Sequence, residues 1–358
     1  MNLMKALTNL GKIIVSDFVM GSGKRPPTIS DVARRANVSI ATVSRVLNAS
    51  PLVIADTAER VQAAIKQLSF VPHATARGLA SRRTRTLGLV LPEIGREYFS
   101  PLLRGIESEV RQAGYHLLIE ATETPDTTQP YLRGLGEYNT DGLIMFAGSI
   151  EDQELSRLHM NGFPVVLLNQ TPPEGLDIPV IAIENKSSAQ KIVEHLIGTH
   201  HCRRIVFLRG QTGHEDSIWR EKGYREALKN HDIPFDSSLV ASGGFEHDEA
   251  REAIKQMMID GVGFDAIFTG DDDAATGVFA ALHQAGKHVP QDVAVVGFDD
   301  APFSRYLTPP LTTVRAPTEE VGRTAVRQLL KIIQTEQADP LILLPTELVI
   351  RSSCGCQS

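Results

Sequence analysis

Residues 28–50, TISDVARRANVSIATVSRVLNAS, constrain the fold of this chain more than any other stretch. Two short apolar sets recur within it at helical spacing, separated by a turn at Asn37, a residue type that tolerates the left-handed conformation. Thr28 and Asp31 are spaced as a capping box for the first helix, and Ser39 is positioned to cap the second. Two short helices joined by such a turn form a helix-turn-helix unit.

In such units the first residues of the second helix contact base edges in the major groove of DNA. Arg45 is predicted to bind guanine, because its planar guanidinium matches the two acceptors that guanine presents there. Apolar base contacts are predicted for Ile40 and Ala41. Phosphate contacts are predicted for three hydroxyl side chains, Ser39, Thr42 and Ser44. The two-helix pattern alone leaves open an ordinary helical hairpin with a solvated polar face.

The distribution of charge favours the nucleic-acid interpretation. The whole chain carries a formal net charge of −7, yet residues 21–86 contain eleven Lys or Arg and three acidic residues, a net charge of +8. Residues 1–20 add +1, so residues 87–358 carry −16. A basic N-terminal region on an acidic body suits binding to a phosphate backbone. A third helix, expected to begin with a capping box at Asp56 and Glu59, completes a helical domain over residues 27–71.

The stretches ISDVARRANVSIATVSRVLN and ERVQAAIKQLSFVPHATARGLASRRTRTLGLVLP resemble the head and linker of the LacI/GalR (lactose-repressor) family of bacterial transcription regulators. The resemblance continues through GFDDAPFSRYLTPPLTTVR and LPTELVIRSSC and covers residues 27–354. It implies a hinge helix and linker over residues 72–86, in which Leu79 wedges into a base step from the minor groove and Arg77 lies beside it. Residues 1–26 precede the usual start of the family and are expected to be a disordered or misassigned extension.

Short apolar strands alternate with helical stretches through residues 87–358, which predicts an α/β fold with doubly wound parallel sheets. A helix is expected over residues 220–230. Strands are expected at 87–91, 116–121, 142–146, 165–169, 180–183, 205–209, 266–269, 293–298 and 311–315.

The family resemblance implies that this effector-binding and dimerisation region has two lobes, like the periplasmic sugar-binding proteins, joined by three crossings. The N-lobe is expected over about 87–185 and 316–342. The C-lobe is expected over about 186–315 and 343–358.

Ligands of open parallel sheets bind beyond the carboxyl ends of the strands, so polar and aromatic residues at those ends form the candidate effector site. The resemblance implies that effector hydroxyls are held by Arg220, Asp271 and Asp299. It implies that the ligand is flanked by Tyr98, Phe99 and Phe245. Further candidates near the same wall are Asn169, Asp216 and Trp219. We expect Arg220 and Asp299 to lie at opposite lips of this cleft.

This residue set suits a carbohydrate, because Asp and Arg pair well with vicinal hydroxyls and aromatic rings pack on the apolar faces of a sugar. A purine effector stays open. Purely structural roles also stay open. Tyr98 and Phe99 could be core residues. The acids at 271–273 could cap the following helix, which we prefer for Asp272 and Asp273.

The sequence therefore predicts a ligand-responsive transcriptional regulator, a repressor that binds a palindromic operator as a homodimer and whose DNA affinity is controlled by a small effector. The effector is expected to be a carbohydrate, and the location cytoplasmic, at the bacterial nucleoid. The alternatives are a sugar-binding transport protein, a purine-responsive repressor of the same fold, and a hydrolase using the Asp cluster.

Several features are missing from the sequence. It contains no G-x-S-x-G, P-loop or H-E-x-x-H motif, so no catalytic residues and no cofactor are expected. The three cysteines offer no metal or disulfide framework, and the C-x-C pair at Cys354 and Cys356 is expected to be inert. No apolar run of 18 residues occurs, so no membrane partner is expected.

Overall fold

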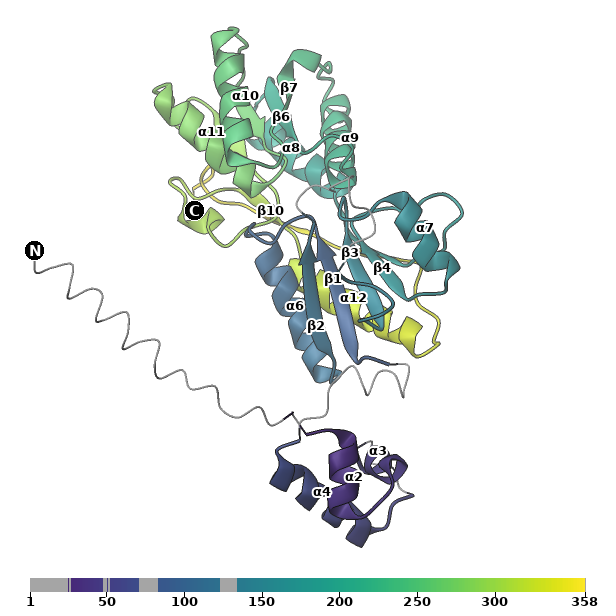
Figure 1. Ribbon diagram of the computed structural model, residues 1–358. Helices are drawn as coiled ribbons and strands as arrows, with labels where there is room; N and C mark the ends of the chain where they lie inside the picture. Colours follow the sequence, from purple (N-terminus) through teal and green to yellow (C-terminus); the bar gives the residue numbers. More distant parts are fainter. Residues whose placement is uncertain are drawn as a thin grey trace, which may run out of the picture. The chain divides into compact units, whose positions relative to one another are not determined.

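The chain divides into two units, Met1–Arg82 and Arg83–Ser358 (Figure 1). The computed structural model describes residues 25, 27–47, 50, 52–70, 83–122 and 134–357. Arg77 and Leu79 of the expected hinge, and all but one residue of the expected N-terminal extension, lie outside the described residues.

The first unit contains α2 (Ile29–Ala36), α3 (Ile40–Leu47) and α4 (Ala55–Leu68). The predicted capping box of α2 is confirmed: the Asp31 amide donates to the Thr28 hydroxyl over 3.3 Å, and the Thr28 amide donates to the Asp31 carboxylate over 2.9 Å. Asn37 ends the helix in the left-handed conformation with φ 53°, also as predicted. Ser39 caps α3 by accepting a hydrogen bond from the Thr42 amide over 3.1 Å.

The capping box predicted for α4 is wrong. The helix begins at Ala55, so its N-cap is Ile54, which has no side-chain oxygen to accept an amide hydrogen bond. Asp56 lies inside the first turn, where the positive end of the helix dipole stabilises its negative charge. Its carboxylate lies 3.6 Å from the Arg60 guanidinium.

The three helices of this unit enclose one small apolar core. It contains Val32, Ala33, Ala36, Val43, Val61, Ala64 and Phe70. Only Val43 of α3 is fully buried in it, so most of the α3 surface remains available to a partner.

The N-lobe of the second unit is built on a parallel sheet of order β11-β5-β4-β3-β1-β2. Its strands are β1 (Thr86–Leu91), β2 (His116–Ala121), β3 (Gly142–Phe146), β4 (Val165–Leu168), β5 (Val180–Ile183) and β11 (Leu341–Leu344). Its helices are α6 (Phe99–Gln112), α7 (Asp152–Met160) and α12 (Thr318–Ile333). Leu87, Leu89 and Leu91 of β1 pack with α6 and α12, whereas Val90 packs on the opposite face with α7. The helices α6 and α12 lie side by side (Figure 1). This alternation is the period of two that a sheet covered on both faces requires.

The C-lobe is built on a parallel sheet of order β7-β6-β8-β9. Its strands are β6 (Ile205–Arg209), β7 (Val240–Ser242), β8 (Ala266–Phe268) and β9 (Ala294–Val296). Its helices are α8 (Lys186–His200), α9 (Glu215–Asn230), α10 (His247–Ile259) and α11 (Asp272–Gln284). Ile205 and Phe207 pack on the side of α8 and α9, and Val206 and Leu208 pack on the side of α10 and α11.

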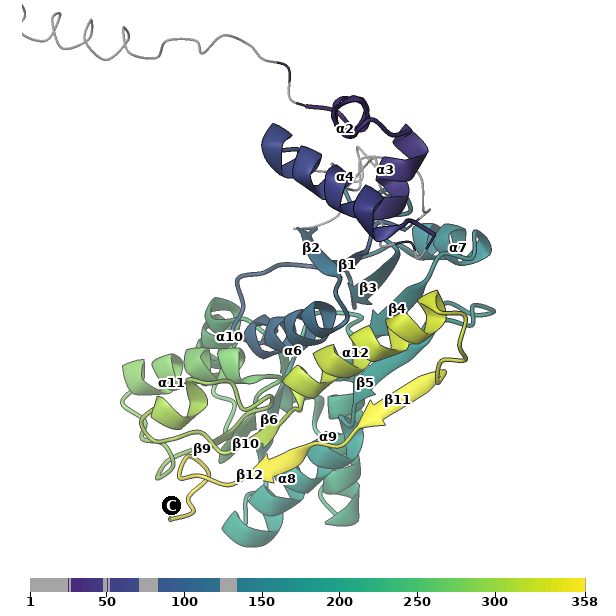
Figure 2. The same cartoon turned by 90° about the horizontal axis from the view of Figure 1, so that it is seen from below.

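Three connections join the lobes. They lie between β5 and α8, between β10 (Thr313–Arg315) and α12, and between β11 and β12 (Glu347–Val349) (Figure 2). The third falls at residues 345–346, later than expected, because β11 pairs with β5 as far as Leu344. Leu343 and Leu344 therefore belong to the N-lobe sheet rather than to the C-lobe.

The nine predicted strands are all present, with ends shifted by at most two residues. The strands β7, β11 and β12 were not predicted: each has only three or four residues and pairs with a strand distant in the sequence. It also began α9 too late, because the polar first turn from Glu215 has no apolar stripe. Among the described residues, no helix combines the length and apolar character needed to cross a membrane.

Gly223 of α9 allows close contact with α8, since a Cβ there would lie 2.2 Å from the Lys186 carbonyl oxygen. We expect Gly223→Ala to lower the free energy of unfolding by about 1–3 kcal/mol, because backbone cannot move aside and the loss exceeds the ~1 kcal/mol gained in helix propensity. Gly198 of α8 is the control, since a Cβ there meets no atom within 4 Å. Urea unfolding of both variants measures the contrast; equal stabilisation by both would contradict the packing argument.

Candidate effector site and DNA-contacting helix

Arg220, in the second turn of α9, is the centre of a buried polar network at the carboxyl ends of the strands. The residue is 2% exposed. Its Nε donates to the Asn185 side chain over 2.8 Å, and its Nη1 donates to the Gly270 carbonyl over 2.5 Å. Its Nη2 lies 3.5 Å from the Asp299 carboxylate. The guanidinium also lies 3.7 Å from the centre of the Phe298 ring, so one face is covered by an aromatic surface.

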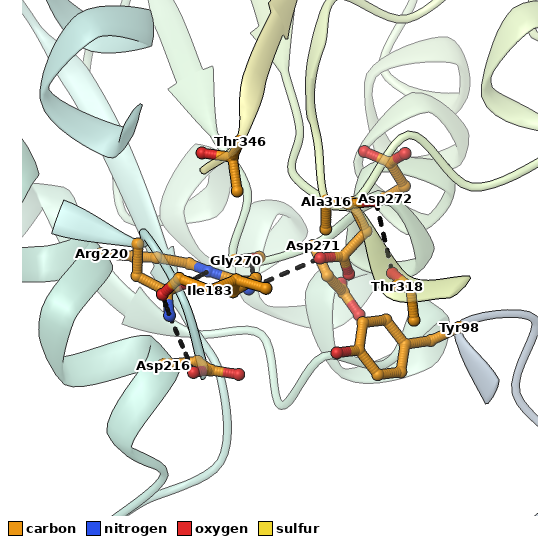
Figure 3. A network of polar contacts seen from close by, with 12 residues as sticks. Tyr98, Ile183, Asp216, Arg220, Gly270, Asp271, Asp272, Ala316, Thr318 and Thr346 are labelled. Atoms are coloured by element: carbon orange, nitrogen blue, oxygen red, sulfur yellow. Dashed lines mark hydrogen bonds and ion pairs between the residues drawn. The ribbon is translucent and has the colours of Figure 1, made fainter. Parts of the chain in front are cut away.

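A second set of contacts joins the two lobes above this network. Asn169, which follows β4 in the N-lobe, donates to Asp216 of α9 over 3.1 Å and to the Tyr98 hydroxyl over 3.2 Å. Asp216 in turn accepts from Asn185 over 2.8 Å. In Figure 3, Asp216 and Arg220 lie on one side of the site, and Tyr98, Asp271 and Thr318 lie on the other.

The two lobes enclose a cleft of about 540 Å³. Its walls include Tyr98 from the N-lobe, Asp271 and Asp299 from the C-lobe, and Ala316 and Thr318 from the second connection. This volume is in the range that small-molecule sites occupy, and the lining combines an aromatic ring with convergent polar groups.

Among the described residues, this region contains several acidic side chains but only one buried guanidinium, that of Arg220. Burial raises the pKa of Asp299 to about 6, against the lowering effect of Arg220. Burial, reinforced by the nearby charge of Asp299, raises the pKa of Asp271 well above its usual value. Carboxyl groups whose pKa is raised this far are a feature of functional sites, because a fold gains no stability from burying them ionised.

Non-glycine residues in the left-handed conformation cluster at the same strand ends. They are Asn169 with φ 52°, Phe245 with φ 63°, Asp299 with φ 107° and Asp300 with φ 55°. Such conformations are unfavourable for residues that carry a Cβ, and they persist where the surrounding structure holds a side chain in a required position.

Three buried polar atoms near the cleft have no hydrogen-bond partner among the described residues: Asn169 Oδ1, Gln170 Oε1 and His214 Nδ1. Burial lowers the pKa of His214, so its ring is neutral at pH 7. The ring lies edge-on to Phe245, with centroids 5.2 Å apart. These atoms offer hydrogen bonds that a polar ligand can complete.

Direct contacts also hold the lobes together around the cleft. Arg96, after β1, donates to the Phe245 carbonyl over 2.9 Å and forms an ion pair with Glu246. Thr171, after β4, donates to the Glu215 carboxylate twice, from its amide and its hydroxyl, each over 2.8 Å. The described arrangement is therefore a closed pair of lobes.

Most of the residues predicted for the effector site come together in this region, with two exceptions. Phe99 is 3% exposed and packs behind Tyr98 and Phe146, so it belongs to the core. Trp219 is 41% exposed, its ring contacts the Lys222 ammonium, and it is not among the residues that line the cleft.

Two further expectations require correction. Arg220 and Asp299 are direct partners rather than residues at opposite lips of the cleft. Asp271, not Asp272, caps α11, by accepting from the Ala274 amide over 2.9 Å. Asp272 and Asp273 both lie in the first turn of α11, but the Asp272 carboxylate does not cap the helix: it accepts from the Ala301 amide and from the hydroxyls of Ser304 and Thr313.

Asn185, which is 4% exposed and connects Asp216 to Arg220, was not predicted from the sequence. It lies two residues after the end of β5, so the rule that ligands bind beyond the carboxyl ends of strands could have found it.

In the helical unit, the face of α3 predicted to contact DNA is accessible. Ser39, Ile40, Ala41 and Arg45 are exposed, and Thr42 and Ser44 are half-exposed. Arg45 forms no ion pair within the described part of the chain, in contrast to Arg34, whose guanidinium is paired with Asp31.

Residues 28–73 match the family model for bacterial regulatory proteins, lacI family, and residues 193–354 match a periplasmic binding protein-like domain. The chain is 33% identical over 328 residues to the ribose operon repressor of Halalkalibacterium halodurans, which covers 91% of this chain and 96% of the relative. The chain belongs to the lacI family of bacterial regulatory proteins. It is a transcriptional regulator, and the predicted family and fold class are confirmed.

Solved structures of lacI-family regulators agree with this assignment. The transcriptional regulator CelR in a cellobiose complex is 30% identical, with a TM-score of 0.69 over 91% of this chain and 99% of that one. The lac repressor dimer bound to operator and the anti-inducer ONPF is 26% identical, with a TM-score of 0.79 over 92% of this chain and 99% of that one.

Removing the guanidinium at the centre of the site tests the account of its electrostatics. Arg220→Met is expected to lower the free energy of unfolding at pH 7.5 by about 3–5 kcal/mol, because it leaves Asp299 buried and unpaired. The loss should shrink toward pH 5, where Asp299 is protonated, and Asp299→Asn should recover part of it. Urea unfolding at both pH values measures the loss of stability. A loss that does not change with pH and that Asp299→Asn does not relieve would contradict this account of the electrostatics.

Proposed function

We propose that this lacI-family regulator is a repressor that binds a palindromic operator as a homodimer and is controlled by an uncharged sugar bound between its lobes. The DNA-binding part is supported by the exposed face of α3 and by the exposed Arg45 guanidinium, which has no ion-pair partner among the described residues. Two symmetry-related heads on one dimer read two half-sites of a palindrome, with α3 in the major groove. Ser39, Thr42 and Ser44 contact phosphates, and Ile40 and Ala41 contact base edges.

The hinge proposal rests on the sequence resemblance. Residues 72–86 connect the head to the body, and Leu79 and Arg77 enter the minor groove at the centre of the operator. The regulator acts at the nucleoid in the cytoplasm and catalyses no reaction in this scheme.

The observation that carries the effector proposal is the contact of Arg220 with Asp299, a residue that lines the cleft. A planar guanidinium and a carboxylate side by side match a pair of vicinal hydroxyls. The cleft is lined by eight acidic residues and four arginines, so even with Asp271 and Asp272 protonated its walls carry more negative than positive charge, which disfavours sugar phosphates and other anions. Tyr98 and Phe245 supply aromatic surface against which a sugar ring packs. Relatives named for ribose and cellobiose have carbohydrates as their stated ligands or operons.

Control of DNA affinity follows from the closed arrangement of the lobes. A ligand that bridges Tyr98 and Asn169 of one lobe to Asp271 and Asp299 of the other favours closure, and closure changes the spacing of the hinges in the dimer. The coupling is reciprocal, so operator DNA must change effector affinity by the same factor.

Arg45 is expected to provide base recognition. On palindromic duplexes selected from a random pool by the purified regulator, Arg45→Ala should weaken binding by about 1–3 kcal/mol and relax specificity at one base position. Arg60→Ala is the matched control, since Arg60 is an exposed arginine of α4 paired with Asp56. Equal losses on selected and unrelated duplexes would show that Arg45 contacts only phosphate.

Asp299 is expected to make effector binding depend on pH. Sugar hydroxyls donate to the ionised carboxylate, and burial raises the pKa of Asp299 to about 6. The fraction of the protein that can bind the sugar therefore falls as the pH drops through 6. Affinity for the sugar found in a thermal-shift screen should fall about tenfold between pH 7 and pH 5. Asp299→Asn should flatten the profile and weaken the sugar response while leaving operator binding intact. An unchanged calorimetric titration of the variant would exclude this site.

A further inference from the structure

Two histidines and two cysteines form a cluster in the C-lobe, away from the effector site. His195 and His200 belong to the last turns of α8, and Cys354 and Cys356 belong to the tail that follows β12. Their four ligand atoms all lie within 4.8 Å of one another. Cys354 Sγ lies 3.5 Å from His195 Nε2, although the two residues are 159 positions apart in the chain. Cys356 Sγ lies 3.6 Å from His195 Nε2 and 3.4 Å from His200 Nε2.

These three distances match sulfur–nitrogen edges of the tetrahedron that four ligands form around a metal ion. A zinc ion holds thiolate sulfur at about 2.3 Å and imidazole nitrogen at about 2.0 Å with tetrahedral angles, so neighbouring sulfur and nitrogen ligands lie about 3.6 Å apart. The three observed separations, from 3.4 to 3.6 Å, fall within a few tenths of an ångström of that value. Small movements of the side chains complete the coordination.

Gly355 lets both cysteines of the C-x-C pair face the histidines. Its φ of 109° lies in the region that favours glycine, and a Cβ at this position would lie 3.0 Å from His200 Nδ1. The tail therefore folds closely over the end of α8, and a side chain between the two cysteines would push His200 away.

Cys354 is 2% exposed, and the other three residues are half-buried, so the cluster is shielded from bulk water yet reachable.

We propose that His195, His200, Cys354 and Cys356 bind one zinc ion as a structural site that ties the C-terminal tail to α8. Two thiolates and two imidazoles are the ligands that zinc prefers, and four protein ligands leave no position for a reacting water. Two thiolates neutralise the charge of the ion. Because α8 follows the first connection between the lobes and the tail follows the third, the ion joins two segments that enter the C-lobe separately.

The test uses the full chain, purified without added chelator under reducing conditions. Metal analysis should find one zinc per chain. After zinc is exchanged for Co²⁺, the visible spectrum should show the intense bands of a tetrahedral ion together with thiolate-to-cobalt charge transfer in the near ultraviolet. Removal of zinc by a chelator should lower the midpoint of thermal unfolding, and added zinc should restore it.

Matched variants identify the ligands. The cobalt spectrum should be lost in Cys354→Ser and in His200→Asn, and the spectrum of Gly355→Ala should be weakened or shifted. Cys202→Ala is the control: Cys202 lies in the same lobe and is buried, but it is not among the four ligands, so its variant should keep the full spectrum. His195→Gln keeps the proposal testable if the loss of a buried thiol prevents folding, and circular dichroism verifies the fold of each variant.

Two results would overturn the proposal. One is a Co²⁺ spectrum that is identical in the original protein and in the Cys354→Ser, Cys356→Ser double variant. The other is purified protein that contains no zinc, takes up no Co²⁺ and has Cys354 and Cys356 joined in a disulfide.

Discussion

The burial of one arginine organises the body of this protein. A guanidinium keeps its proton at any physiological pH, so Arg220 in the interior requires hydrogen-bond acceptors from its surroundings. Asn185, the Gly270 carbonyl and Asp299 supply them from three segments that are distant in sequence. These contacts fix the ends of β5, β8 and β9 relative to α9. Burial holds the pKa of Asp271 and Asp299 above the usual value, and these carboxyl groups retain capacity to bind a ligand.

The same network relates the effector site to the movement that a regulator needs. Tyr98 and Asn169 come from the N-lobe, while Asp271 and Asp299 come from the C-lobe. A ligand held by both groups stabilises one relative position of the lobes, and the Arg96–Glu246 and Thr171–Glu215 contacts favour that closed position. Left-handed residues at the strand ends hold the polar side chains in place before a ligand arrives.

Local patterns in the sequence were sufficient for much of the fold. The capping box of Thr28 and Asp31 was predicted because all of its atoms lie within one turn of chain. The same rule failed for Asp56, since it depends on which residue begins the helix, and Ile54 holds that position. Sequence reasoning missed the pairing of β11 with β5 and the three donors that turn Asp272 away from α11, because both depend on segments far along the chain.

By itself, the sequence determined the helix-turn-helix head, the parallel α/β body, the family and the strand ends where polar residues gather, because each follows from short-range spacing or from motifs. Only the tertiary structure decided that Arg220 contacts Asp299, that Asn185 connects Asp216 to it, and that Phe99 belongs to the core. It also brought Cys354 and Cys356 to the histidines of α8. The physical reason is the same in each case. The partners of a side chain depend on how distant segments pack, and the spacing of residues along the chain does not reveal that packing.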